Sequence, residues 1–229
     1  MVLDPMMGGG TTLVECRLLG RDAIGVDVNF KAVALSMRRL RFLVSPETAP
    51  SMIKMFVGDA RQLNLVRPGV VDLIMLHPPY WNVIRYGGGT VEGDLSATDT
   101  LADYFSGIRE VAAECFRVLK PGRICAVMAG DTRRSHLYVP LAFGVMARFL
   151  NEGFSLLESI VKIQHNVRSE RVHSAVQDSG FYRISHEHLF IFRKPISSDP
   201  GEAQRHTSSM SAMYSVRSAM LDSGTSPER

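Results

Sequence analysis

Four consecutive residues near the middle of the chain, His77-Pro78-Pro79-Tyr80, combine groups that could position a ligand for chemistry. They follow a mostly apolar run, Val70 to Leu76, which predicts a buried strand. The prolines end that strand because neither can donate to a sheet ladder, and they keep the preceding backbone extended. Stiff carbonyls, an imidazole and two aromatic rings, the second from Trp81, would then lie beyond the carboxyl end of a strand, where α/β sheets bind ligands. The simpler alternative is a proline turn with an aromatic side chain packed beside it.

A glycine-rich turn, Pro5 to Thr12, follows a short strand that ends at Asp4. Gly8 and Gly10 allow backbone to approach a ligand closely, and the N–H groups at the start of the next helix suit an anion such as a carboxylate. Thr11 or Thr12 is expected to cap that helix. A glycine-rich turn alone is a weak signal for ligand binding.

Acidic residues at the next two strand ends strengthen this signal. Asp27 ends the second predicted strand, roughly 20 residues beyond the turn, where an acceptor meets ribose hydroxyls. Asp59 ends the third strand and is a further acceptor. Either residue alone would more often cap a turn or a helix. Three polar strand ends in register favour a binding site.

Strands and helices alternate along most of the chain, which predicts an α/β fold: a mostly parallel seven-stranded sheet with helices on both faces. After the short first strand, the expected strands are Ala23–Val26, Met52–Val57, Val70–Leu76, Ile124–Ala129, Leu156–Ile163 and Ile184–Phe192. The expected helices run from the glycine turn to Leu19, through the apolar positions Ala32 to Leu43, and over Leu101–Leu119 and Tyr138–Leu150. No helix separates the last two strands, so the last strand is expected to run antiparallel.

The bulk composition suits one globular domain, expected over residues 1–195, with a Ser-rich tail over 196–229 that we expect to be disordered. The formal net charge of +3 permits a polyanionic partner without requiring one. The three cysteines are scattered and predict no zinc site or disulfide framework. No apolar run reaches the length of a membrane span, so we expect a soluble, cytoplasmic protein without a membrane partner.

Six segments carry a more specific signal. They are Asp4-Pro5-Met6-Met7-Gly8-Gly9-Gly10-Thr11-Thr12, Asp27, Gly58-Asp59-Ala60, His77-Pro78-Pro79-Tyr80, Phe116-Arg117-Val118-Leu119-Lys120-Pro121-Gly122 and Ser185-His186-Glu187-His188-Leu189-Phe190-Ile191-Phe192-Arg193-Lys194. In this order they resemble the motifs of S-adenosylmethionine-dependent amino-methyltransferases of DNA, which methylate the exocyclic amine of adenine or cytosine. The resemblance covers Val2 to about Pro195 and implies a Rossmann-like class I methyltransferase fold.

The resemblance also implies roles for individual residues. The residues implied at the cofactor, S-adenosylmethionine, are Asp4, Pro5, Gly8, Gly10, Thr11, Asp27 and Asp59. Of these, Asp4, Gly8 and Gly10 would line the methionine end. Asp27 would hold the ribose, and Asp59 would hold the adenine. The residues implied in catalysis are His77, Pro78, Pro79 and Tyr80.

The proline corner makes chemical sense for such a reaction. An exocyclic amine is a poor nucleophile because its lone pair is delocalised into the ring. Acceptors for both amine hydrogens, the Pro78 carbonyl and the His77 side chain, would favour the pyramidal form, and Tyr80 could stack on the base. The base must be flipped out of a duplex or already single-stranded. The family more often has Asp, Asn or Ser at the position of His77, and a protonated imidazole accepts no hydrogen bond.

Other candidate residues are less specific. The loop Asn82 to Thr98, with Trp81 before it and Arg85 and Tyr86 within it, could close over a base or could be a surface loop. The arginines that could contact phosphates, or could simply be solvated, are Arg133, Arg134, Arg168, Arg171 and Arg183. His186 and His188 share a strand face, but without a third ligand they predict no metal site.

Three functional hypotheses follow. The first is a site-specific DNA methyltransferase acting on adenine or cytosine, as in restriction-modification. The second keeps the chemistry but moves it to an RNA base or a protein amide. The third is a catalytically impaired remnant or subunit that binds nucleic acid, because the family usually carries another segment of the methionine pocket that this chain lacks. A partner chain or a missing segment could complete the pocket, or the chain could bind the cofactor weakly. The oligomeric state is left open.

Overall fold

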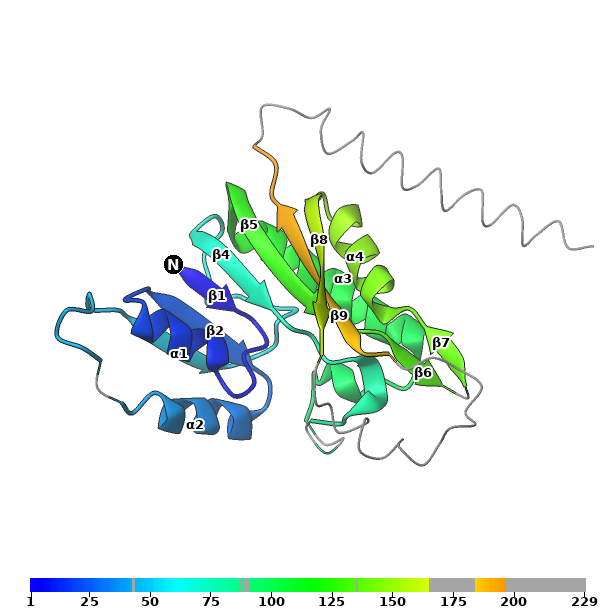
Figure 1. Ribbon diagram of the computed structural model, residues 1–229, viewed down its shortest axis with the longest axis horizontal. Helices are drawn as coiled ribbons and strands as arrows, with labels where there is room; N and C mark the ends of the chain where they lie inside the picture. Colours follow the sequence, from blue (N-terminus) through cyan, green and yellow to red (C-terminus); the bar gives the residue numbers. More distant parts are fainter. Residues whose placement is uncertain (43, 87, 89–90, 135, 165–183, 197–229) are drawn as a thin grey trace, which may run out of the picture.

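The structure, a computed structural model, describes residues 1–42, 44–86, 88, 91–134, 136–164 and 184–196. Its central sheet contains seven strands: β1 (Val2–Asp4), β2 (Ala23–Asp27), β3 (Ile53–Val57), β4 (Val71–Leu76), β5 (Leu119–Ala129), β8 (Ser155–Ile163) and β9 (His186–Arg193). They are arranged in the order β3-β2-β1-β4-β5-β9-β8 (Figure 1). All neighbours pair in parallel except β9, which is antiparallel to both β5 and β8. The predicted seven-stranded α/β sheet with an antiparallel last strand is confirmed.

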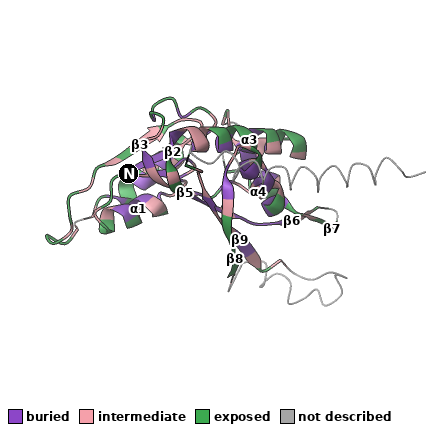
Figure 2. Ribbon diagram, turned by 90° about the horizontal axis from the view of Figure 1, so that it is seen from above, coloured by how far each residue is buried: buried purple, intermediate pink, exposed green. Residues whose placement is uncertain are grey.

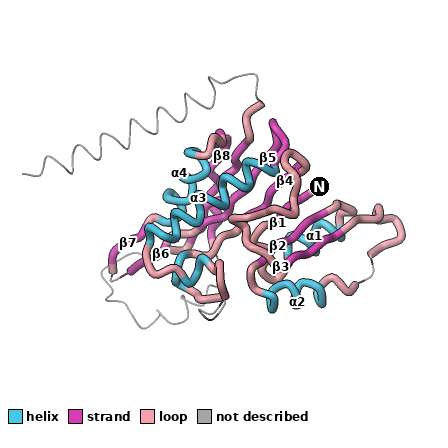
Figure 3. The backbone as a smooth tube through the Cα atoms, turned by 180° about the vertical axis from the view of Figure 1, so that it is seen from behind, coloured by secondary structure: helices cyan, strands magenta, loops and turns pink. Residues whose placement is uncertain are grey.

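Helices cover both faces of this sheet, as predicted. They are α1 (Thr11–Leu18), α2 (Phe30–Arg39), α3 (Leu101–Val118) and α4 (Leu141–Asn151). Alternate strand residues face opposite sides, so Ala23 packs with α1 and α2 whereas its neighbour Ile24 packs in the larger cluster with α3 and α4. In Figure 1 α1 lies in front of the sheet and α3 behind it, and Figure 3 shows the reverse view. Figure 2 shows the buried residues concentrated between these layers.

Two boundaries differ from the sequence prediction because of prolines and glycines. β5 begins at Leu119 rather than Ile124, and a register shift against β4, with Gly122 at a φ of 76°, carries the strand through Pro121. The helix expected from Tyr138 begins instead at Leu141, because Pro140 cannot be accommodated inside a helix. The residues before it form a separate hairpin, β6 (Thr132–Arg134) and β7 (Leu137–Val139).

Smaller differences occur at helix ends and in the long loop. The first helix begins after Gly10, which occupies the cap position with left-handed backbone and no side-chain cap, so the cap predicted at Thr11 or Thr12 is wrong. The second helix ends at Arg39 rather than extending to residue 43. The loop after the proline corner contains two short 3-10 turns, Trp81–Val83 and Leu95–Ala97.

Some predictions fall outside the described residues, namely those for Arg168, Arg171, Arg183 and the tail at 197–229. The three cysteines, Cys16, Cys115 and Cys125, are buried and free. Within the described part of the chain, no helix combines the length and hydropathy required to cross a bilayer.

Candidate functional site

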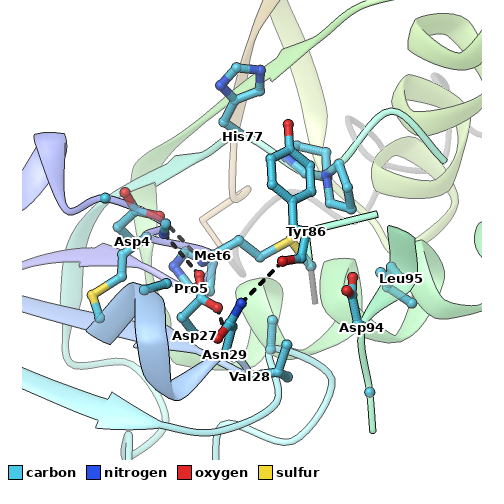
Figure 4. A pocket seen from close by; sticks show the side chains of 18 of the residues that line it. Asp4, Pro5, Met6, Asp27, Val28, Asn29, His77, Tyr86, Asp94 and Leu95 are labelled. Carbon is cyan, nitrogen blue, oxygen red and sulfur yellow. Dashed lines mark hydrogen bonds between the residues drawn. The ribbon is translucent and has the colours of Figure 1, made fainter. Parts of the chain in front are cut away.

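The glycine turn and the proline corner open onto the same cavity, of about 710 Å³ (Figure 4). Its size is within the range of small-molecule and cofactor sites. The turn after β1, the end of β2, the corner after β4 and the loop that follows the corner form much of its lining, and the start of α2, the residues after β3 and Glu187 of β9 complete it. The predicted site residues among its lining are Asp4, Pro5, Gly8, Thr11, Asp27, Asp59, His77, Pro78, Pro79, Tyr80 and Tyr86. The parallel order β2-β1-β4 explains this convergence, because it brings three carboxyl strand ends to one edge.

A hydrogen-bond chain fixes the proline corner to β9. The hydroxyl of Tyr80 donates to Glu187, and Lys162 on β8 donates to the other carboxylate oxygen at 2.8 Å. Burial raises the pKa of Glu187, but the bonds from Lys162 and Tyr80 outweigh this effect and leave the pKa lowered. Burial and the Glu187 hydrogen bond raise the pKa of Tyr80, so it remains a hydroxyl donor.

This series of hydrogen bonds determines which ring nitrogen of His77 carries the proton. Its Nε2 atom lies 2.7 Å from the Tyr80 hydroxyl oxygen. Because that hydroxyl already donates to Glu187, the oxygen can only accept from His77, which places the ring proton on Nε2 and leaves Nδ1 as an acceptor. Partial desolvation lowers the pKa of His77, Lys162 lowers it further, and Glu187 opposes them. The imidazole is therefore neutral near pH 7.

The backbone of the corner is held from the core side. Tyr104 on α3 donates its hydroxyl to the carbonyl of Pro79 at 2.7 Å. Pro78 lines the cavity, and within the described residues no hydrogen bond engages its carbonyl. Gly130, after β5, permits the ring of Tyr80 to lie against the backbone, because a Cβ there would be 2.9 Å from the ring. The corner is thus rigid and retains one free acceptor carbonyl.

Asp4 places a carboxylate in an unusually dry position. The residue is 7% exposed, and desolvation raises its pKa to about 6, with hydrogen bonds from Thr12 and Met6 opposing the rise. Its Oδ1 atom accepts from the Met6 backbone at 3.2 Å. A buried carboxylate without a cationic partner on the described chain is costly for folding, and such groups cluster at functional sites.

Asp27 joins the glycine turn to the end of β2. Its two oxygens accept from the backbone of Gly8 at 2.9 Å and of Asn29 at 2.8 Å. Desolvation raises its pKa, while those two bonds oppose the rise. Each carboxylate oxygen retains a second acceptor site, so Asp27 can serve both as a turn brace and as a ligand acceptor.

The two glycines of the turn have different surroundings. Gly8 has a φ of 49°, and a Cβ added there would meet nothing within 4 Å. Gly10 has a φ of 72°, but a Cβ there would be 2.5 Å from the Ser36 hydroxyl oxygen on α2. Gly8 therefore leaves its backbone open to the cavity, whereas Gly10 lies outside the cavity lining and permits the packing of α1 against α2.

Of Asp59 and the residues expected to contact the base, only some line the cavity. Asp59 lines the cavity, but its carboxylate pairs with Arg61, with a closest contact of 2.6 Å. Tyr86 lines the cavity and accepts at its carbonyl from Asn29 (Figure 4). Trp81 is buried outside the lining and donates to the Thr98 carbonyl at 3.1 Å. Arg85 is exposed and also lies outside the lining.

The arginines of the β6–β7 hairpin pack on aromatic rings. Arg134 lies over Trp81 at 4.7 Å and donates to Asn82, and Arg133 lies over Tyr138 at 5.4 Å. A phosphate contact by either guanidinium remains a prediction.

Several cavity residues received no role from the sequence. Glu187, Asn29 and Asp94 all line the cavity. Glu187 comes from a strand far along the chain, and only the antiparallel register of β9 brings it to Tyr80. The local signal for Asn29 was its place before the second helix, where its side chain caps the Lys31 backbone.

Comparisons with known proteins agree with this arrangement. A family model described as DNA methylase matches residues 71–218, more than half of the chain. The chain is 26% identical over 170 residues to the type II beta methyltransferase M.BslI of Bacillus sp. (strain NEB-606), covering 66% of this chain and 18% of that protein. It is 30% identical over 83 residues to the type II methyltransferase M.SmaI of Serratia marcescens, covering 36% and 27% respectively. The chain thus spans less than a third of the length of either relative.

Solved structures show the same fold. A SAM-dependent methyltransferase from Methanosarcina mazei superposes with a TM-score of 0.58 at 15% identity, covering 85% of this chain and 92% of that one. Together with the seven-stranded sheet and its antiparallel β9, this similarity confirms the Rossmann-like class I fold. On the family match, the chain belongs to the DNA methylase family of amino-methyltransferases.

Proposed function

We propose that this chain transfers a methyl group from S-adenosylmethionine to the exocyclic amino group of adenine or cytosine in DNA, as a type II modification enzyme does. The observation that carries the proposal is the single cavity lined by both the glycine turn and the His77-Pro78-Pro79-Tyr80 corner. A cofactor and a base could meet in that space without rearrangement of the sheet. Family membership supports the choice of DNA over RNA or protein.

The turn half of the cavity fits the cofactor. Open space at Gly8 leaves the backbone accessible, and the buried carboxylate of Asp4 has no cationic partner on the described chain. Asp4 would face the methionine end, with Pro5 and Thr11 beside it, and Asp27 would accept from the ribose. Asp59 would accept from adenine in exchange for one of the contacts that Arg61 makes with both of its carboxylate oxygens. Gly10 would support the turn through α2 packing. When bound, the cofactor supplies an electrophilic sulfonium methyl.

The corner half would prepare the amine. The Nδ1 atom of neutral His77 and the carbonyl of Pro78 would accept one amine hydrogen each, which favours the pyramidal nucleophile. Tyr80 would stack on the flipped or single-stranded base, with its ring fixed by Glu187. Tyr86 would contact the base from the loop, while Trp81 would anchor that loop from the core and Arg85 would reach the DNA backbone. Pro79, held by Tyr104, would keep the corner rigid.

Two measurements on the purified chain test this proposal. Calorimetry with S-adenosylmethionine should show binding that weakens by more than about 10-fold in Asp27→Ala, because the ribose acceptor is lost. Radiolabelled methyl transfer, offered DNA, RNA and protein side by side, should label DNA. The absence of binding at millimolar cofactor would instead favour a remnant that needs a partner chain. Label on RNA or protein but not on DNA would refute the DNA assignment.

A further inference from the structure

A cluster of three metal-ligating side chains lies at the junction of β5, β9 and α4. Asp131, His186 and His188 each offer one ligand atom, and these atoms lie within 4.8 Å of one another. The sequence pattern supplied the two histidines but no third ligand. The antiparallel register supplies it: Ala129 pairs with His188, so Asp131, two residues further along, reaches the level of His186.

The cluster is distinct from the cavity. Side chains alternate along a strand, so His186 and His188 point to the face opposite Glu187, which lines the cavity. On that face the ring of His188 stacks on the ring of Phe190, with a centroid distance of 5.5 Å. The ring of Phe143, on α4, lies 5.2 Å from His188. An ion there would lie behind the sheet and would not contact the cofactor or the base.

Two observations indicate a ligand rather than a self-contained network. His188 is only 9% exposed, yet its Nδ1 atom is buried without a hydrogen-bond partner among the described residues. Buried polar atoms rarely remain unpaired. Asp131 is 8% exposed and is already oriented, because its oxygens accept from the Ala142 backbone at 2.8 Å and from the Tyr138 hydroxyl. Such outer hydrogen bonds are what hold ligating carboxylates in place.

We propose that Asp131, His186 and His188 bind one divalent transition-metal ion, with zinc as the best fit, as a structural clamp between β5, β9 and α4. Two imidazoles and one carboxylate suit zinc better than magnesium or calcium, which prefer oxygen ligands. Zinc bonds of about 2.0–2.1 Å place tetrahedral ligands roughly 3.3 Å apart. The ligand atoms, now within 4.8 Å of one another, would have to move closer on binding, for which His186 is only partly buried, and water would complete the fourth position.

The test uses the full chain, stripped with a chelator and titrated with Co²⁺, whose four-coordinate complexes absorb strongly in the visible range. We expect one equivalent to bind with strong visible bands, and Zn²⁺ to displace it. Zn²⁺ should also raise the melting temperature. Asp131→Asn and His186→Gln should each weaken binding by more than about 10-fold. His186→Gln is the decisive variant, because that side chain is partly exposed and its loss leaves the core intact.

Matched histidine variants control for adventitious binding. His136→Gln, on the hairpin, and His77→Gln, on the cavity face, should bind Co²⁺ as the parent chain does. The absence of stoichiometric binding overturns the proposal. So does binding that persists unchanged in both Asp131→Asn and His186→Gln, with each variant shown to be folded by circular dichroism.

Discussion

At the scale of single residues, two cavity groups change charge as the pH falls below neutrality, and their effects on the methyl-transfer rate can be told apart. His77 has a lowered pKa and can accept a hydrogen bond only when neutral. Asp4 has a pKa of about 6, so it also changes charge below neutral pH. With cofactor saturating, we expect the methyl-transfer rate to be constant from pH 8 to about 6.5 and to fall only as the pH drops below the ordinary histidine value.

His77→Asn separates the two groups. Asparagine accepts a hydrogen bond through its amide oxygen and does not titrate. We therefore expect this variant to remain active and to lose the acidic fall in rate, as measured from single-turnover rates at saturating cofactor. An unchanged acidic fall in His77→Asn would assign it to Asp4 and would remove His77 from the acceptor role.

Asp4→Asn should stabilise the fold while weakening cofactor binding. The folded chain binds a proton at Asp4 more tightly than the unfolded chain, whose pKa is near 3.8. The contribution of Asp4 to the free energy of unfolding is therefore most favourable below pH 3.8, and it becomes less favourable as the pH rises toward and beyond about 6. At pH 7 the cost is about 3 kcal/mol. Urea unfolding should show a gain of roughly 1–3 kcal/mol in Asp4→Asn at pH 7 and little gain at pH 3.5. A loss of stability at pH 7 would contradict the burial argument.

At the scale of elements, the two glycines of the turn between β1 and α1 have different roles, Gly8 in cofactor binding and Gly10 in helix packing. Gly8 and Gly10 both have positive φ, so alanine costs about 1–2 kcal/mol of backbone strain at either position. Only at Gly10 does the added Cβ also collide with Ser36. We expect Gly10→Ala to be less stable than Gly8→Ala by at least about 1 kcal/mol in denaturant unfolding. Gly8→Ala should show the larger loss of cofactor affinity, and the reverse order in both measurements would refute this division.

A substitution at Gly130, directly after β5, tests the proline corner separately from the cofactor half of the cavity. Alanine at Gly130 would place a Cβ 2.9 Å from the ring of Tyr80, which Glu187 holds in place. We expect Gly130→Ala to raise the KM for DNA and to leave cofactor affinity unchanged. The rise in KM should correspond to a loss of at most ~1–3 kcal/mol of binding free energy, which is what stacking of one base contributes. Steady-state kinetics together with calorimetry check both parts. A normal KM for DNA would show that the position of Tyr80 does not control base binding.

Sequence periodicity located most elements of the central sheet, because strands such as β2 and β4 are short apolar runs with a clear stop. It failed where a local rule depended on partners. The strand through Pro121 is possible only because β4 accommodates a register shift, and the hairpin before Pro140 has only three residues in each strand. These features come from pairing and not from local propensity.

At the scale of the whole molecule, strand order is what creates the site. The parallel order β2-β1-β4 brings the turn, Asp27 and the proline corner to one edge, and this was predictable from alternation and motif order. The contribution of β9 was not predictable. Glu187 reaches Tyr80, and Asp131 reaches His186, only through the antiparallel pairing of β5 with β9. The buried position of Trp81 was not predictable either, because an aromatic residue after a strand can pack into the core or line a cavity.

The most direct test of the central claim is nucleoside analysis of DNA incubated with the chain and S-adenosylmethionine. The shared cavity predicts N6-methyladenine or N4-methylcytosine in the digest, and a strong reduction of that product in Tyr80→Ala, whose cofactor binding should persist. A methylated product of undiminished yield in Tyr80→Ala, or C5-methylcytosine in place of an amino-methylated base, would contradict the account.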